Sequence, residues 1–187
     1  VIQAGELDKV VLARGVRVDS TEPVPILRVF RELVRSYPKC YNFAWKSFGS
    51  VFMGASPELL VRVVDGELTS NPLAGSAPRG EGDQEDARLG RDLLTSPKDR
   101  QEHALVVDDL EERLSGVVED LVVPSEPELK KMATVQHLST LITGSYHGSV
   151  LDIVDRIHPT PAVGGVPTPD AVAYIDSNED LDRGWYS

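Results

Sequence analysis

The run from Ile157 to Pro167, I-H-P-T-P-A-V-G-G-V-P, constrains the fold of this chain more than any other segment. It holds three prolines and two glycines within eleven residues. Proline fixes φ and lacks an amide donor, and glycine permits positive φ, so neither a long helix nor a central strand fits there. The run predicts a rigid, irregular connection, which suits the wall of a ligand site and is also common in ordinary loops.

The length, charge and cysteine content of the chain limit its size class and its possible partners. At 187 residues the chain is long enough for one domain with a sizeable core, or for part of a larger one. Thirty acidic and nineteen basic residues leave a formal charge of −11, which repels phosphate, so we expect no nucleic-acid partner and no membrane partner. No apolar run approaches the ~20 residues that span a bilayer. The lone Cys40 permits no internal disulfide, and we expect a cytoplasmic protein.

Apolar periodicity in the first half predicts strands around one helix. The pattern favours a helix over Ile26–Ser36, ended by Pro38, and a hairpin turn at Asp65-Gly66. The expected strands are Val10–Val18, Tyr41–Phe48, Val51–Ala55 and Leu59–Val64. The last three predict an antiparallel meander. Lys9 then lies at a strand end, where sites are commonly built.

The second half predicts more helices. A polar helix follows Gly80–Gly82 and runs to Leu94, and Ser96-Pro97 caps a longer helix. The apolar stripe expected on that longer helix is Ala104, Val107, Leu110, Leu114 and Val117. Further segments are strands at Thr134–Leu138 and Leu141–Tyr146, and helices at Val150–Ile157 and from Thr168 to about Ile175. Strand groups followed by helices, without βαβ alternation, favour an α+β fold with antiparallel sheets and flanking helices.

Six short motifs follow one another in a fixed order. Besides the proline-rich run they are K-V-V-L-A-R at Lys9–Arg14, G-A-S-P-E-L-L-V at Gly54–Val61, P-L-A-G-S-A-P-R-G at Pro72–Gly80, K-D-R-Q-E-H-A-L-V at Lys98–Val106 and D-R-G-W-Y at Asp182–Tyr186. Their order resembles the chorismate-utilizing enzymes, the family of anthranilate synthase component I, aminodeoxychorismate, salicylate and isochorismate synthases. Within it, H-P-T-P-A-V-G-G is similar to the isochorismate synthases. The resemblance implies a layered α/β sandwich and chorismate as substrate.

The resemblance also bears on the extent of the domain. The chain opens at Val1 without a methionine and ends just after D-R-G-W-Y, whereas chains of the family continue through further strands and a glycine-rich segment. We therefore expect residues 1–187 to form one chorismate-binding catalytic domain that lacks its C-terminal segment. A non-catalytic remnant or an interaction module stays open on the same grounds.

Two residues carry the chemistry that the resemblance implies, which is water addition at C2 of the ring and loss of the C4 hydroxyl. Lys9 resembles the family lysine that activates water, where anthranilate synthases typically have glutamine. A lysine with an ordinary pKa near ~10.4 is protonated at neutral pH, so this role requires burial or a nearby cation. Glu58 resembles the acid that protonates the departing hydroxyl, and it must be buried to hold its proton. The structural alternatives are a surface lysine and an exposed strand-end glutamate.

Glu102 resembles a family glutamate that binds magnesium. Mg²⁺ prefers carboxylate oxygens and keeps several waters, so one or two protein carboxylates and the substrate carboxylate suffice. The cation would offset the repulsion between an acidic protein and dianionic chorismate. The family's other magnesium glutamates belong to a segment beyond Ser187. Glu102 is otherwise one of many solvated helix glutamates.

Four further positions are candidates for substrate contact, the last two of them by resemblance. Gly75 and Ser76 bring backbone N–H groups and a hydroxyl, although a tight turn between strands is the alternative. His137 matches a family active-site histidine, although a hydrogen-bonded core histidine is the alternative. Ala162, which faces the substrate by resemblance, would leave room for water beside C2. Aminodeoxychorismate synthases typically have lysine where this chain has Ala74.

The implied activity is that of a Mg²⁺-dependent isochorismate synthase that feeds menaquinone, siderophore or salicylate synthesis. A salicylate synthase adds pyruvate elimination on the same scaffold and stays open as an alternative. An anthranilate or aminodeoxychorismate synthase agrees less well with Lys9 and Ala74. The sequence does not decide the oligomeric state.

Overall fold

The α+β fold with antiparallel sheets and flanking helices, predicted from the sequence, is confirmed. The computed structural model describes residue 2 and residues 5–186, so Val1 and Ser187, the ends of the expected domain, lie outside the described residues. Within that part of the chain, five helices accompany four small sheets, and every recorded strand pair is antiparallel.

Two sheets form the base of the molecule. The four-stranded sheet has the order β4-β5-β10-β7, and its strands are β4 (Leu59–Val64), β5 (Glu67–Asn71), β10 (Ile142–Ser145) and β7 (Glu119–Val122). The three-stranded sheet has the order β6-β9-β8, and its strands are β6 (Leu73–Pro78), β9 (Val135–Ser139) and β8 (Glu128–Lys131). Only Pro72 separates β5 from β6, so the chain passes directly from one sheet to the other.

Two short ribbons complete the strands. One is the hairpin of β2 (Tyr41–Ser47) and β3 (Ser50–Ser56). The other joins β1 (Lys9–Val10) to β11 (Gly165–Val166), which are far apart in the sequence. The expected meander is therefore wrong in one respect, because β4 pairs with β5 in another sheet and not with β3.

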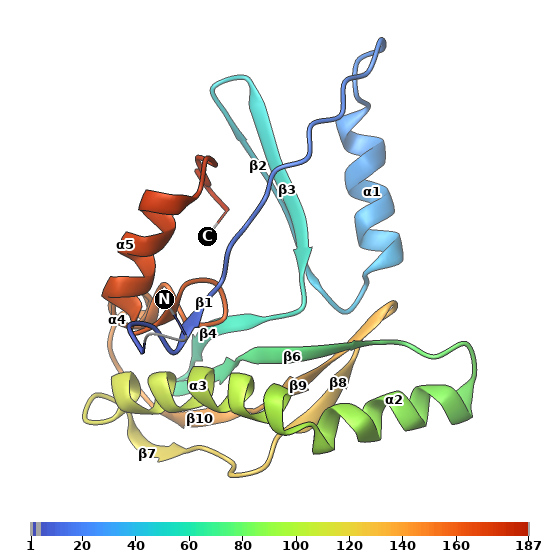
Figure 1. Cartoon of the computed structure of the whole chain (residues 1–187). Helices are drawn as coiled ribbons and strands as arrows, with labels where there is room; N and C mark the ends of the chain where they lie inside the picture. The colour runs from blue at the N-terminus through green and yellow to red at the C-terminus, as the bar shows by residue number, and fades with distance from the viewer. Residues whose placement is uncertain (1, 3–4, 187) are drawn as a thin grey trace.

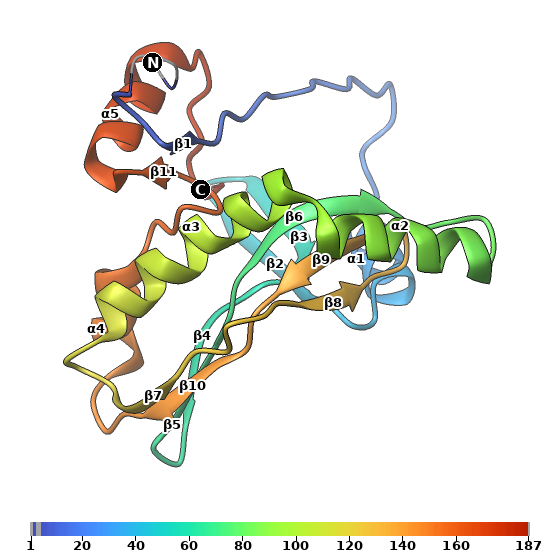
Figure 2. The same ribbon diagram turned by 60° about the horizontal axis from the view of Figure 1, so that its bottom comes forward.

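The helices are α1 (Ile26–Ser36), α2 (Asp83–Thr95), α3 (Pro97–Leu114), α4 (Val150–Ile157) and α5 (Thr168–Asn178). Figure 2 shows α2 and α3 running across β6 and β9, so that helices cover one face of the sheets. The predicted cap of α3 is present, since the Ser96 side chain accepts the Asp99 N–H at 3.3 Å. No helix among the described residues is long and apolar enough to cross a membrane.

The core lies between α3, α4 and the four-stranded sheet. It contains Leu68, Ala74, Val106, Leu110, Leu114, Val118, Ile142, Ile153 and Ile157. The predicted stripe on α3 is confirmed for Val107, Leu110 and Leu114, which are buried. Ala104 is exposed and Val106 is buried instead, so the buried face of the helix is rotated from the expected one.

The expected strand Val10–Val18 is wrong beyond its first residue. A strand needs a partner, and β11 offers only two residues, so the ladder ends at Val10. Val16 and Val18 are 73% and 86% exposed in the irregular segment that follows. The edge strands β7 and β8 were not predicted, because their polar sequences E-D-L-V and E-L-K-K lack an apolar run.

α1 and the β2–β3 hairpin lie apart from this core. Figure 1 shows both projecting away from the two larger sheets. The helix was predicted with its bounds, yet none of its residues is buried, and Leu27 is 73% exposed. The hairpin contacts the C-terminal segment through Trp45 and Trp185, whose ring centroids are 6.0 Å apart.

Candidate functional site

Lys9 is held in place by the proline-rich run. In the β1–β11 ribbon Lys9 pairs with Val166, and the amides of Asp8 and Val11 donate to the carbonyls of Val166 and Gly164, each at 2.8 Å. Gly165 permits this close approach, because a Cβ there would lie 2.1 Å from the Lys9 carbonyl oxygen. The run therefore forms the wall against which Lys9 is placed.

The Lys9 side chain points into the molecule and is only 9% exposed. Its Nζ lies 3.4 Å from Oε1 of Glu102, on the first turns of α3. Burial lowers the pKa of Lys9, while the charges of Glu102 and Glu58 act in the opposite direction. The burial that a water-activating lysine requires is thus present.

Glu58 lies between β3 and β4, directly after Pro57. Its amide donates to Ser56 Oγ at 3.3 Å, and the Leu73 amide donates to Glu58 Oε1 at 3.4 Å. Burial raises the pKa of Glu58, and the Leu73 N–H and the charges of Lys9 and Lys130 partly offset the rise. Lys9, Glu58 and Glu102 therefore lie together although they come from three distant segments.

Ser76 and His137 face each other across β6 and β9. Ser76 Oγ and His137 Nδ1 are 2.8 Å apart. Gly75, with φ +72°, sits where the β6–β9 register shifts, and a Cβ there would lie 3.1 Å from Asp99 Cβ. This β-bulge turns Ser76 toward His137 and requires glycine. Burial lowers the pKa of His137.

Lys130 lies between the Glu58 segment and the Ser76–His137 pair. The sequence analysis did not identify it. It lies in β8, opposite His137 in the register. Its Nζ donates to the Pro57 carbonyl at 2.8 Å and to Asn71 Oδ1 at 2.7 Å. No motif contains Lys130, and the pair Lys130-Lys131 reads as a solvated edge, so only the spatial pairing of strands reveals it.

Ala162, in the proline-rich run, faces the core. It packs against the core cluster, within the turn that the Val163 and Gly164 amides close onto the Thr160 carbonyl.

His103, which the sequence analysis left as structural or orienting, is buried, and its Nε2 lies 2.8 Å from Thr140 Oγ1. Its burial lowers its pKa to about 4, so the ring is neutral near pH 7.

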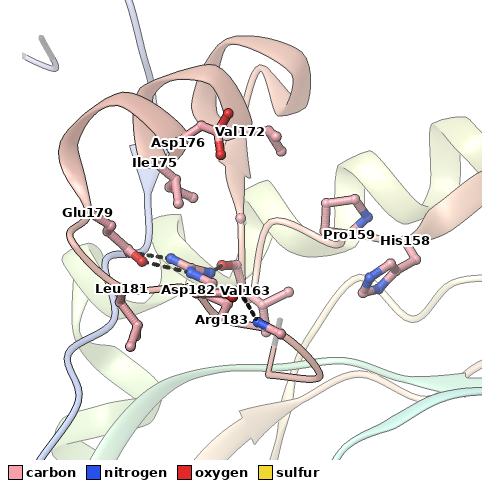
Figure 3. Close-up of a pocket in the computed structure, with 12 residues that line it drawn as sticks. His158, Pro159, Val163, Val172, Ile175, Asp176, Glu179, Leu181, Asp182 and Arg183 are labelled. Carbon is pink, nitrogen blue, oxygen red and sulfur yellow. Dashed lines mark hydrogen bonds and ion pairs between the residues drawn. The ribbon is translucent and has the colours of Figure 1, made fainter.

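Arg183 of the D-R-G-W-Y motif binds both chain segments of the β1–β11 ribbon at their ends. Arg183 binds the Glu179 carboxylate and donates to the carbonyls of Val163 at 3.1 Å and Val11 at 2.8 Å. Figure 3 shows this ion pair at the rim of a cavity of about 340 Å³ between α5 and the proline-rich run. The cavity is lined by neither Lys9 nor Glu58, so Arg183 supports the site from outside.

Glu102 can supply one oxygen ligand to a metal. Its side chain is 40% exposed, which leaves an oxygen accessible beside Lys9. Among the described residues no group of three or more His, Cys, Asp or Glu side chains is arranged to hold a metal ion. A single carboxylate suffices for Mg²⁺ only where water and substrate supply the other ligands.

Comparison with known proteins places this geometry in a family. The family described as chorismate binding enzyme matches residues 1–187. The chain belongs to the chorismate-binding enzymes. Its similarity to the salicylate biosynthesis isochorismate synthase of Pseudomonas aeruginosa is 42% identity over 188 residues, which covers 100% of this chain and 39% of that protein.

Solved structures of the family agree. The Bacillus anthracis protein assigned as the 2,3-dihydroxybenzoate-specific isochorismate synthase DhbC matches with a TM-score of 0.92 and 38% identity, over 97% of this chain and 51% of that one. MenF, the menaquinone-specific isochorismate synthase of Escherichia coli, matches with a TM-score of 0.82 and 31% identity, over 89% and 39%. The chain thus spans about half or less of the length of these relatives.

Proposed function

We propose that this protein is an isochorismate synthase, which converts chorismate to isochorismate. The proposal rests on one observation above all, the placement of the buried Lys9 side chain 3.4 Å from Glu102 and near enough to Glu58 for their charges to interact. Burial lowers the pKa of the lysine and raises the pKa of Glu58, so it favours the neutral form of each. A neutral amine and a neutral carboxylic acid are the base and the acid that a hydroxyl exchange needs. The names of the similar relatives support the same reaction.

The reaction divides between the two residues. Lys9 takes a proton from water as the water oxygen bonds to C2 of the ring. The ring double bonds shift, the C4–oxygen bond breaks, and Glu58 gives its proton to the departing hydroxyl, which leaves as water. Lys9 ends protonated and Glu58 ends ionised, and proton exchange with solvent restores both. The product is an isomer of the substrate, so no oxidant or second substrate is consumed.

The remaining residues bind and orient. Glu102 would hold Mg²⁺, which when bound neutralises a substrate carboxylate. Ser76 and His137 offer a hydroxyl and a ring nitrogen near the Glu58 side of the site, as Lys130 links the two. Ala162 and Gly75 act through the backbone and through packing. The whole of residues 1–187 serves as part of one chorismate-binding catalytic domain.

Turnover of chorismate tests the proposal. The protein is incubated with chorismate and Mg²⁺, and products are separated by chromatography with absorbance and fluorescence detection. Isochorismate is the expected product, and a chelator should abolish its formation. Accumulation of fluorescent salicylate would instead identify a salicylate synthase, and full turnover in excess chelator would remove Glu102 from its metal role.

Two substitutions test the assignment of base and acid. Lys9→Ala and Glu58→Gln should each lower kcat by about 10²–10⁴-fold while KM changes less, because each group acts on the reacting atoms. Lys98→Ala, which removes an exposed lysine one turn from Glu102, is the matched control and should keep the native rate. A Lys9→Ala protein with the native kcat would contradict the mechanism.

A further inference from the structure

Lys130 is bound to both chain segments that hold the Glu58 carboxyl group. Its first acceptor is the carbonyl of Pro57, the residue directly before Glu58. Its second acceptor, Asn71 Oδ1, belongs to the end of β5, two residues before Leu73, whose amide donates to Glu58. One ammonium group therefore joins the backbone that carries Glu58 to the backbone that binds its oxygen.

The second acceptor is itself fixed. The Asn71 side chain is buried, and its Nδ2 donates to Ser139 Oγ at 2.9 Å. Ser139 belongs to β9 and pairs in register with Glu128 of β8, the strand that carries Lys130. Because each of these polar groups has its partner, the network is a rigid frame.

Charged groups surround Glu58 from two sides. Lys9 faces it from β1 and Lys130 faces it from β8, and both favour the ionised carboxylate against the effect of burial. The charge of Lys130 also lowers the pKa of His137 on β9. The charge of Cys40, which precedes β2, raises the pKa of Lys130 itself. Lys9 and Lys130 thus both lower the pKa of Glu58, from two different strands.

We infer that Lys130 is a positioning residue for Glu58: it clamps the Pro57–Glu58 turn to the end of β5 and directs the carboxyl group toward the substrate. This inference rests on the proposed function. Lys130 does not replace Lys9 as the base, since its Nζ is engaged with the two acceptors.

Direct titration of Glu58 separates this role from a merely structural one. Carboxyl ¹³C NMR of the 187-residue chain follows the midpoint of Glu58, assigned by the signal that disappears in Glu58→Gln. Lys130→Met keeps the length of the side chain but removes its charge and its donors, so the Glu58 midpoint should move upward. Lys130→Arg keeps the charge and can donate to both acceptors, so it should return the midpoint toward the native value.

The neighbouring lysine supplies the control. Lys131 lies in the same strand, but its Nζ binds Asp86 at 2.7 Å and does not contact the Glu58 segments. Lys131→Met changes the net charge by the same amount as Lys130→Met. It should leave the Glu58 midpoint at the native value even where it lowers the melting temperature.

Kinetics give the second readout. Lys130→Met should lower kcat by about 10–10²-fold with a smaller change in KM, because a displaced acid slows the chemical step more than binding. Lys130→Arg should recover most of this loss. A Lys130→Met chain with the native Glu58 midpoint and the native kcat overturns the inference, whatever its melting temperature. If the native protein fails to turn over chorismate, the titration still decides the role of Lys130, so the two proposals fail separately.

Discussion

At the scale of single residues, one physical effect shifts the pKa values of two groups in opposite directions. Burial disfavours charge, so it lowers the pKa of Lys9 and raises the pKa of Glu58. Their mutual attraction opposes both shifts, so burial is the larger cause of each pKa shift. The motifs identify these residues, and the requirement for burial follows from ordinary pKa values.

The sequence does not reveal the partners that complete such a site. Lys130 stands in a polar edge strand beside Lys131, and nothing local distinguishes the two. One binds the Glu58 segments and the other binds Asp86, because alternate residues of a strand point to opposite faces. That distinction requires knowing which strands are neighbours.

The Glu179 carboxylate contributes to the stability of the fold in acid. Hydrogen bonds from Arg183 and from the Ala13 amide lower its pKa to about 2. A depressed carboxylate pKa stabilises the fold above the unfolded value of 4.5, and this contribution is lost as pH falls toward about 2. Urea unfolding followed by circular dichroism should show a smaller loss of stability over this range for Glu179→Gln than for the native chain.

The matched control for that experiment is Glu67→Gln, which removes an exposed carboxylate of β5. It should retain the native dependence on pH. Equal slopes for Glu179→Gln and the native chain would show that the Arg183 pair does not contribute to acid stability.

At the scale of elements, the sequence predicts best where a signal is local. The start of α3 follows from Ser96-Pro97, and the turn after β4 follows from Asp65-Gly66, both of which have positive φ. The length of a strand depends on its partner strand as well as on its own sequence. The valines after Val10 have high β-propensity, yet the ladder stops because β11 is two residues long.

The two adjacent glycines of the proline-rich run provide a matched pair of substitutions. A Cβ at Gly165 would lie 2.1 Å from the Lys9 carbonyl and 2.7 Å from Ala171 Cβ, whereas at Gly164 the nearest atom is 3.5 Å away. Gly165→Ala should therefore separate the ribbon, lower the melting temperature and lower kcat by displacing Lys9. Gly164→Ala should fold with nearly native stability.

Thermal unfolding and chorismate turnover check this pair. The backbone amide chemical shifts of Asp8 and Val11 report the ribbon directly, because both amides donate across it. Unchanged shifts and stability in Gly165→Ala would mean that the ribbon tolerates a side chain at this position.

At the scale of the whole molecule, the chain divides into a packed part and an extended part. α3, α4 and the four-stranded sheet share one core, while α1 buries no residue and the β2–β3 hairpin carries exposed aromatic side chains such as Trp45 and Phe48. Apolar periodicity predicted α1 correctly as a helix. It indicates that a helix has an apolar face, but it does not indicate what covers that face.

Hydrogen exchange should reproduce this division. Amides of α3 and β5 lie in the core and should exchange most slowly, because they open only when the core unfolds. Amides of α1 should exchange fastest among the helices, since few buried contacts oppose its opening. Mass spectrometry of peptides from each region measures the difference in the 187-residue chain. Similar protection in α1 and α3 would show that the helix is stabilised by contacts other than burial.

The β1–β11 ribbon also sets an order in time. During translation Lys9 leaves the ribosome long before Val166, its strand partner, has been made. Until then the lysine has no ribbon to hold it and remains a hydrated ammonium ion. A nascent chain that has emerged only as far as α4 already contains the proposed acid, yet its Lys9 lacks the strand partner that positions it. The proposed site is therefore not assembled until the proline-rich run has been synthesised.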